Sequence, residues 1–167
     1  MFNIEVTFTD YPDDVSLAVI FYMNGCEHNC TDCHNKELQK EKTYPVNIID
    51  KIIDYCNRNK TNKIVLSGGD PLYKTNIDLT NKIIDMCKNN YDICIYTGYN
   101  IDYAKKVLHL GFKFIKSGKY IPELKQKSIK NDDYIQLASS NQEFYNKNYM
   151  LISNKGRYYF NKGEEYV

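Results

Sequence analysis

The chain alternates between short apolar runs and longer stretches in which apolar residues recur every three or four positions. The short runs predict buried strands over residues 16–23, 63–66, 92–96 and 112–115. The recurring pattern predicts amphipathic helices over residues 46–57, 76–88 and 102–110. A repeated strand–helix–strand order is typical of an α/β fold with a mostly parallel sheet. We therefore expect one α/β domain that spans residues 1–167.

Local signals define the predicted helix ends. Pro45 suits the start of the first helix, and Thr75 with Asp78 has the spacing of a capping box for the second. Asn100 is a good cap for the third helix, which Gly111 is expected to stop.

The pattern changes after Pro122. A strand is predicted at 133–137, and a hairpin is predicted at 149–160 around the turn Asn154-Lys155-Gly156.

Each of the four predicted parallel strands runs into a loop that contains glycine or side chains able to bind a ligand. These loops are residues 25–34, 67–71, 96–99 and 116–119. Because the carboxyl ends of parallel strands meet at one edge of a sheet, the four loops are expected to form a single site.

Charge and apolar content limit the classes of function. The net charge is +1, from 22 basic and 21 acidic residues, so the chain lacks the basic character of a nucleic-acid-binding protein. The longest apolar stretch, residues 17–23, is too short to cross a membrane. With no targeting segment visible and six cysteines that need no disulfide framework, we expect a cytoplasmic protein.

Three of the cysteines share one polar loop with the spacing Cys26-x3-Cys30-x2-Cys33. Three thiolates on a [4Fe–4S] cluster leave one iron open to a substrate, because such clusters commonly take four cysteines. The alternative is a Cys3His zinc site completed by His28 or His34, although such sites usually pair two separated ligand knuckles. Cys56, Cys87 and Cys94 lie on apolar faces and are expected in the core.

The cysteine motif resembles the signature of the radical S-adenosylmethionine enzymes. The stretch Gly68-Gly69-Asp70-Pro71 is similar to their Gly-Gly-Glu motif, which holds the methionine part of the ligand. The resemblance implies a partial (β/α) barrel of the radical S-adenosylmethionine type. It also implies a [4Fe–4S] cluster on Cys26, Cys30 and Cys33 that reductively cleaves S-adenosylmethionine.

Further stretches resemble the activating proteins of anaerobic ribonucleotide reductase more narrowly. They are residues 33–36, 66–72, 96–99, 118–120 and 139–142. This resemblance implies that the chain generates a glycyl radical on the large reductase subunit, with reduced flavodoxin or a similar protein as electron donor. It also implies which residues contact S-adenosylmethionine: Asp32, Cys33, His34, Gly68, Gly69, Asp70, Thr97 and Tyr99.

The chain departs from the family pattern in three places. Residues 10–15 lack the glycines and arginine of a common Asp/Asn-Gly-Pro-Gly-x-Arg stretch, Asp32 replaces an aromatic residue, and Ser117 replaces an aspartate. Small activases often lack that aromatic residue, whereas the other two departures leave the protein partner open. The alternatives are an activase of another glycyl radical enzyme, such as pyruvate formate-lyase, a small-molecule radical enzyme, and a zinc-stabilised binding module.

Overall fold

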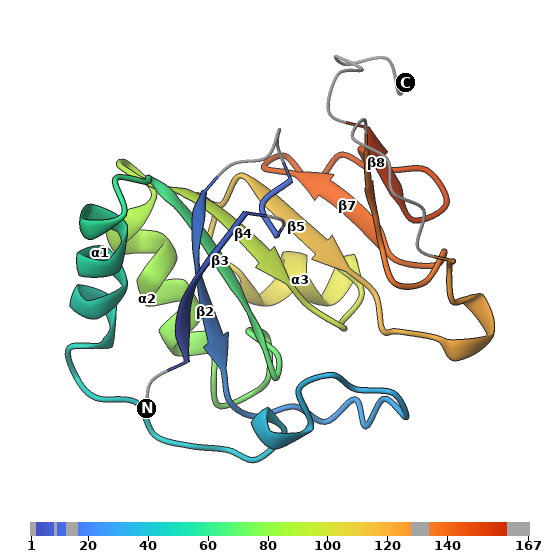
Figure 1. Cartoon of the computed structure of the whole chain (residues 1–167), viewed down its shortest axis with the longest axis horizontal. Coiled ribbons are helices and arrows are strands. Elements are labelled where there is room, and N and C mark those ends of the chain that lie inside the picture. The colour runs from blue at the N-terminus through green and yellow to red at the C-terminus, as the bar shows by residue number, and fades with distance from the viewer. Residues whose placement is uncertain (1–2, 9, 13–16, 128–133, 160–167) are drawn as a thin grey trace.

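A six-stranded mixed sheet organises the chain, of which the computed structural model describes residues 3–8, 10–12, 17–127 and 134–159. In spatial order its strands are β1 (Ile4–Thr7), β2 (Ala18–Met23), β3 (Lys63–Gly68), β4 (Asp92–Tyr96), β5 (Phe114–Ser117) and β7 (Glu143–Asn146). Strands β2 to β5 pair in parallel, and β1 and β7 pair antiparallel at the two edges. The carboxyl ends of β2 to β5 therefore meet at one edge, the lower one in Figure 1.

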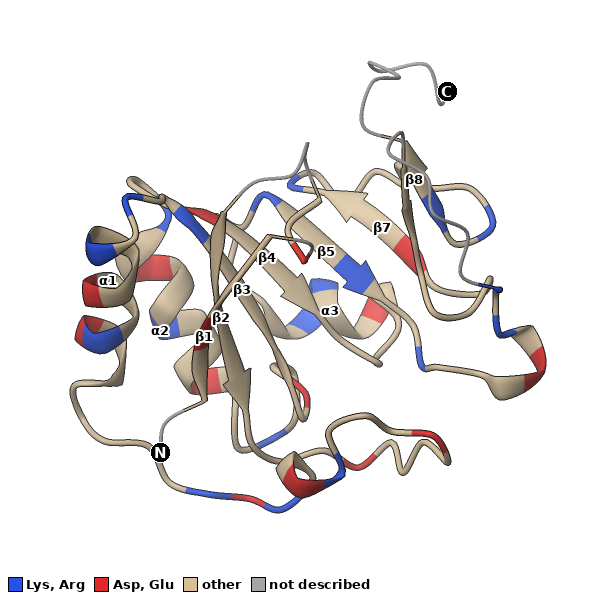
Figure 2. Cartoon of the chain, viewed as in Figure 1, with Lys and Arg blue, Asp and Glu red and all other residues tan. Residues whose placement is uncertain are grey.

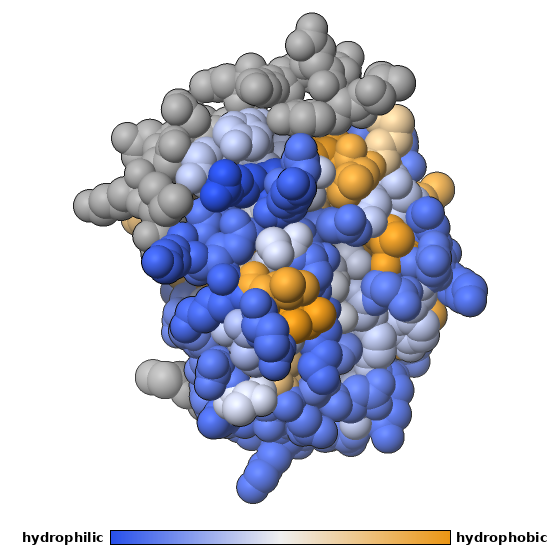
Figure 3. Space-filling model, turned by 90° about the vertical axis from the view of Figure 1, so that its right-hand side faces the viewer, coloured by the Kyte–Doolittle hydropathy of each residue, from blue (hydrophilic) through white to orange (hydrophobic). Residues whose placement is uncertain are grey.

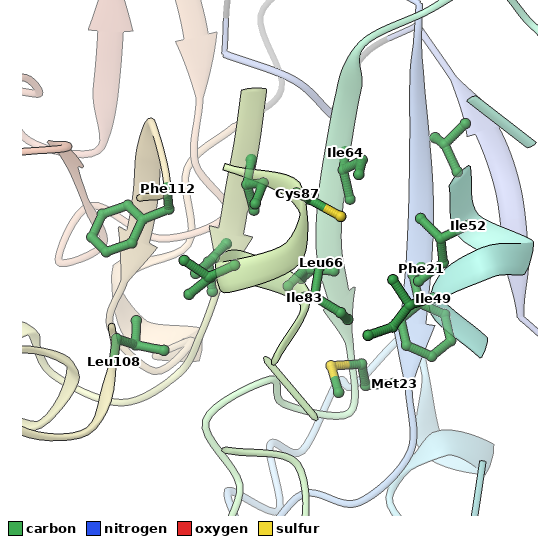
Figure 4. Packing of buried hydrophobic residues seen from close by; sticks show 14 of the residues in the cluster. Phe21, Met23, Ile49, Ile52, Ile64, Leu66, Ile83, Cys87, Leu108 and Phe112 are labelled. Carbon is green, nitrogen blue, oxygen red and sulfur yellow. The ribbon is translucent and has the colours of Figure 1, made fainter. Parts of the chain in front are cut away.

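Three helices cover one face of this sheet: α1 (Ile48–Arg58), α2 (Ile77–Cys87) and α3 (Ile101–Val107). Their buried residues form one apolar core with every second residue of the central strands, such as Phe21 and Met23 of β2. In Figure 4, Ile49 and Ile52 of α1 lie beside Phe21. This packing explains the helical periodicity, because each helix turns one apolar stripe toward the sheet.

The alternate strand residues form a second core on the other face, which includes Ile20, Val65 and Cys94. The late part of the chain covers this face with Leu137 and Phe144, next to a small antiparallel sheet of β6 (Tyr134–Gln136) and β8 (Arg157–Tyr159). Both faces of the central strands are thus buried, which explains why their sequences are apolar throughout.

The late strands differ from the prediction. The turn at Asn154 is present, and Arg157 N donates to Asn154 O at 3.0 Å, but its flanks do not pair as one hairpin. Ile152 bonds instead to Phe144 of β7, and β8 pairs with β6. The predicted strand at 133–137 is observed at 134–136, and the hairpin residue at 160 lies outside the described residues.

Two edge strands, β1 and β7, were not predicted. Both are short, and only Ile4 in β1 and Phe144 in β7 are buried, so neither has a strong apolar run. Since these strands end the sheet on both sides, the sheet is open, and a closed barrel is not formed by the described residues.

The helix ends agree with the prediction in part. Asn100 caps α3 as expected, because its side chain accepts a hydrogen bond from Tyr103 N at 2.9 Å. The capping box at Thr75 and Asp78 was wrong: Asn76 is the N-cap of α2, and its side chain makes no cap bond. Its amide nitrogen donates instead to Asn24 O and Asp70 O, at 2.8 and 2.7 Å, and so joins two loops.

The described part of the surface mixes charges of both signs. Basic and acidic residues are interspersed over the fold (Figure 2), and the face drawn in Figure 3 is hydrophilic with small, separate hydrophobic patches. Among the described residues, no helix has the length and apolar content needed to cross a membrane.

Candidate functional site

The loops that follow β2, β3, β4 and β5 line one cavity of about 230 Å³ at the carboxyl edge of the sheet. This convergence is the one that the strand pattern predicts. Most of the predicted site residues line the cavity: Cys26, Cys30, Cys33, Gly68, Gly69, Asp70 and Thr97.

A second cavity, of about 290 Å³, adjoins the first on the outer side of the cysteine loop, which we define as residues 25–34. Asp32 and His34 line this second cavity with Cys30 and Cys33, and both are exposed. Tyr99 lines neither cavity. The predicted residues therefore form two groups around Cys30 and Cys33, with Tyr99 outside both.

The three loop cysteines suit an iron–sulfur cluster. They are free and partly exposed, and all three face the first cavity. Burial, with smaller contributions from Asp70 and the other two thiols, raises the pKa of Cys26 to about 11 in the metal-free protein. Among the described residues, no three His, Cys, Asp or Glu side chains are placed so that they could hold one metal ion together.

The glycine pair at the end of β3 allows β3 and the residue after it to approach β2 and the cysteine loop closely. Gly68 has φ +104°, and a Cβ there would lie 2.5 Å from Met23 N. A Cβ on Gly69 would lie 2.5 Å from Gly25 O. The amides of Gly69 and Asp70 donate to Met23 O and Gly25 O, at 2.7 and 2.9 Å. Glycine is required here because backbone lies where a side chain would begin.

Asp70 is the most connected side chain of the site, and it is only 1% exposed. Its Oδ1 accepts from Leu72 N and Thr97 Oγ1, and its Oδ2 accepts from Gly98 N, each at 2.8 Å. The Nε2 atom of His28 lies 2.8 Å from the same Oδ2 and donates to it, since an ionised carboxylate only accepts. One carboxylate thus joins the loops after β2, β3 and β4.

The sequence analysis did not identify His28 as a partner of Asp70, and it placed Lys116 in a site loop without assigning it a role. Lys116 lies at the end of β5 and lines the first cavity. Its Nζ donates to Gly118 O at 3.5 Å and lies 5.9 Å from the centre of the Tyr96 ring. Burial lowers the pKa of Lys116 to about 8. The signal that could have identified it is its place directly after the predicted strand 112–115, at the carboxyl edge of the sheet.

Two of the three departures from the family pattern fall on described residues. Ser117 is buried, and its hydroxyl donates to Tyr99 O at 2.9 Å, which holds the β4 loop against β5. Asp32 is exposed beside the second cavity. Of the first departure, residues 10–12 are described, whereas residues 13–15 are outside the described part of the chain.

Comparisons with known proteins agree with three cysteines as candidate ligands of an iron–sulfur cluster. A sequence model of the 4Fe–4S single cluster domain matches residues 16–145. The anaerobic ribonucleoside-triphosphate reductase-activating protein of Escherichia coli K12 is 31% identical, over 79% of this chain and 92% of its own length. The protein of the same name from Enterobacteria phage T4 is 24% identical, over 72% of this chain and 81% of its own.

Among solved structures, QueE from Escherichia coli is similar over 72% of this chain and 60% of its own, with a TM-score of 0.46 and 14% identity. The family model covers most of the chain, and the relative from Escherichia coli K12 exceeds 30% identity over almost its whole length. The chain therefore belongs to the 4Fe–4S single cluster domain family and to the family of anaerobic ribonucleoside-triphosphate reductase-activating proteins.

Proposed function

We propose that this chain is an activating enzyme that reductively cleaves S-adenosylmethionine at a [4Fe–4S] cluster and generates a glycyl radical on the large subunit of anaerobic ribonucleotide reductase. The observation that carries the proposal is that three thiols from one loop face the cavity on which the loops of four parallel strands converge. The names of the similar proteins support the same activity.

In this proposal Cys26, Cys30 and Cys33 hold the cluster. When bound, the cluster and S-adenosylmethionine together supply the radical chemistry. The chain supplies binding and orientation. Gly68, Gly69 and Thr97 border the ligand in the first cavity, and Asp32 and His34 border it on the outer side of the cysteine loop.

A macromolecular substrate fits the open side of the site. A third cavity, of about 270 Å³, continues from Cys30 along residues 119–123, so three adjoining cavities share Cys30 and Tyr120. Such an extended groove is more suitable for a polypeptide segment that carries the glycine than for a small molecule. We propose that the open sheet is a short partial barrel of the radical S-adenosylmethionine type.

The setting of the reaction is part of the proposal. The electron donor is reduced flavodoxin or a similar protein, and the compartment is the cytoplasm. All six cysteines are free thiols, as expected of a reducing compartment.

The test is anaerobic reconstitution with iron and sulfide, followed by reduction in the presence of S-adenosylmethionine. We expect about four irons per chain and release of 5′-deoxyadenosine, both lost in Cys30→Ala. Addition of the large reductase subunit is expected to give a glycyl radical signal by electron paramagnetic resonance. A signal only with pyruvate formate-lyase would favour an activase of that enzyme. One zinc per chain without iron would refute the proposed enzymatic activity.

A further inference from the structure

Two consecutive residues of the cysteine loop are held by side chains from other loops. The Tyr99 hydroxyl donates to Glu27 Oε1 at 2.6 Å, and His28 Nε2 donates to Asp70 Oδ2 at 2.8 Å. Both contacts lie between Cys26 and Cys30, where the loop has no regular secondary structure. The β3 and β4 loops therefore hold the cysteine loop through side chains other than those of the cysteines.

Asp70 is suited to this role because its hydrogen-bonding capacity is full. An ionised carboxylate has about four lone-pair sites, and Asp70 accepts from Leu72 N, Thr97 Oγ1, Gly98 N and His28 Nε2. A ligand ammonium group would have to displace one of these donors, and Leu72 N and Thr97 Oγ1 are buried, so they would be left unsatisfied. The geometry therefore favours a structural use of the Asp70 carboxylate.

The His28 ring is also fixed by packing. It meets the Tyr99 ring edge to face, with centroids 4.5 Å apart and planes at 65°. It lies on Gly98, where a Cβ would be 2.5 Å from His28 Cδ2 and 2.6 Å from His28 Nε2. The absence of a side chain at position 98 thus creates the space that the imidazole occupies.

We propose that Glu27 and His28 anchor the cysteine loop on Tyr99 and Asp70 before any cluster binds, so that Asp70 and Tyr99 are positioning residues for the metal ligands. This inference deepens the proposed function and rests on it only in calling the cysteines cluster ligands. The anchored loop presents Cys26 and Cys30 on either side of two fixed residues. Ordering of the loop then precedes metal binding and does not have to accompany it.

The test measures loop order in the full-length, metal-free chain by ¹⁵N relaxation. In the wild type we expect backbone order parameters of about 0.8 for residues 27–30, close to those of rigid backbone. In His28→Ala we expect values below about 0.6, typical of a flexible loop. His28→Gln, whose amide can donate to Asp70, is expected to restore part of the order. Tyr99→Phe, which removes only the hydroxyl, is expected to affect mainly Glu27.

Gly98→Ala provides a second route to the same result without changing His28. The new methyl group must displace the imidazole, so order over residues 27–30 is expected to fall as in His28→Ala. In the double variant Gly98→Ala/His28→Ala the clash is absent, and the order is expected to equal that of His28→Ala alone. Such non-additivity is the signature of direct coupling between the two positions.

Equal loop order in the wild type and the folded His28→Ala variant would overturn the proposal, as would additive effects of Gly98→Ala and His28→Ala. A global loss of dispersed signals in His28→Ala would leave Gly98→Ala and His28→Gln as the deciding variants. These measurements need no iron. An anchored loop in a chain that fails to assemble a cluster would refute the function alone, and a mobile loop in an active enzyme would refute the anchor alone.

Discussion

The cysteine loop and the helix-covered core contain the same kind of side chain in opposite settings. Cys26, Cys30 and Cys33 are partly exposed and face a cavity lined by polar groups. Cys56 and Cys87 are fully buried among isoleucines, on the inward stripes of α1 and α2. The difference teaches that spacing and environment, and not the thiol itself, distinguish a candidate cluster ligand from a small apolar core residue.

Exchange of one cysteine in each region for serine is expected to give opposite effects. Cys33→Ser replaces a thiolate ligand by a poor one, so iron affinity is expected to fall at least about 100-fold with little change in the stability of the metal-free chain. Cys87→Ser buries a hydroxyl and is expected to cost about 2 kcal/mol of unfolding free energy, with normal iron content. Iron analysis and urea unfolding of both variants test this; loss of iron in Cys87→Ser would contradict the comparison.

Gly68→Ala is expected to strain the contact between the ends of β2 and β3. A Cβ would lie within 3 Å of three backbone atoms at φ +104°, so we expect a loss of about 3 kcal/mol or more in unfolding free energy. Gly118→Ala is the matched control, because its φ is +109° but the nearest atom is 3.4 Å away. We expect it to lose only about 1 kcal/mol, in urea unfolding. Equal losses of unfolding free energy in the two variants would show that the positive φ, and not the close backbone atoms, causes the loss.

Lys116→Met is expected to stabilise the metal-free chain on the order of 2 kcal/mol at pH 7. Burial lowers the pKa of Lys116 from 10.5 to about 8. The buried lysine therefore reduces the unfolding free energy by the full amount below pH 8, and this reduction disappears as the pH rises to 10.5. The advantage of the variant is therefore expected to vanish over that interval. Urea unfolding at pH 7 and pH 10 measures it, with Lys119→Met, an exposed lysine at the same cavity, as the control. A gain in unfolding free energy that is the same at pH 7 and pH 10 would contradict a lowered pKa of Lys116.

The core thiols are expected to cause a loss of stability in alkali. Burial raises the pKa of Cys56 from 9.0 to about 12 and that of Cys87 to about 11. Their contribution is therefore complete below pH 9 and falls as the pH rises toward these values, at up to about 1.4 kcal/mol per pH unit for each thiol. Cys56→Ala is expected to reduce the slope of unfolding free energy between pH 9 and 11. An unchanged slope would mean that other groups cause the loss.

The central strands, the helices and the site edge could be predicted from the sequence, because both faces of β2 to β5 are apolar and each helix has one apolar stripe. The three cysteines could be predicted because their spacing is local. His28 could not be paired with Asp70 in this way, since 42 positions separate them and only the fold brings them together. The edge strands were missed for a related reason: the partners of β1 and β7, and not their own composition, make them strands.

The shared carboxylate of Asp70 has a consequence for the lengths of the surrounding loops. Three loops meet at the Asp70 carboxylate, which has no free lone pair. An inserted residue near any of these hydrogen bonds would move a donor away from Asp70 and leave it unsatisfied. The stretch from Lys40 to Thr43 is different, because it is exposed and carries none of these contacts. Insertions should therefore be tolerated after the cysteine loop and rejected within it, which makes residues 40–43 a suitable place to attach a spectroscopic label or an affinity tag.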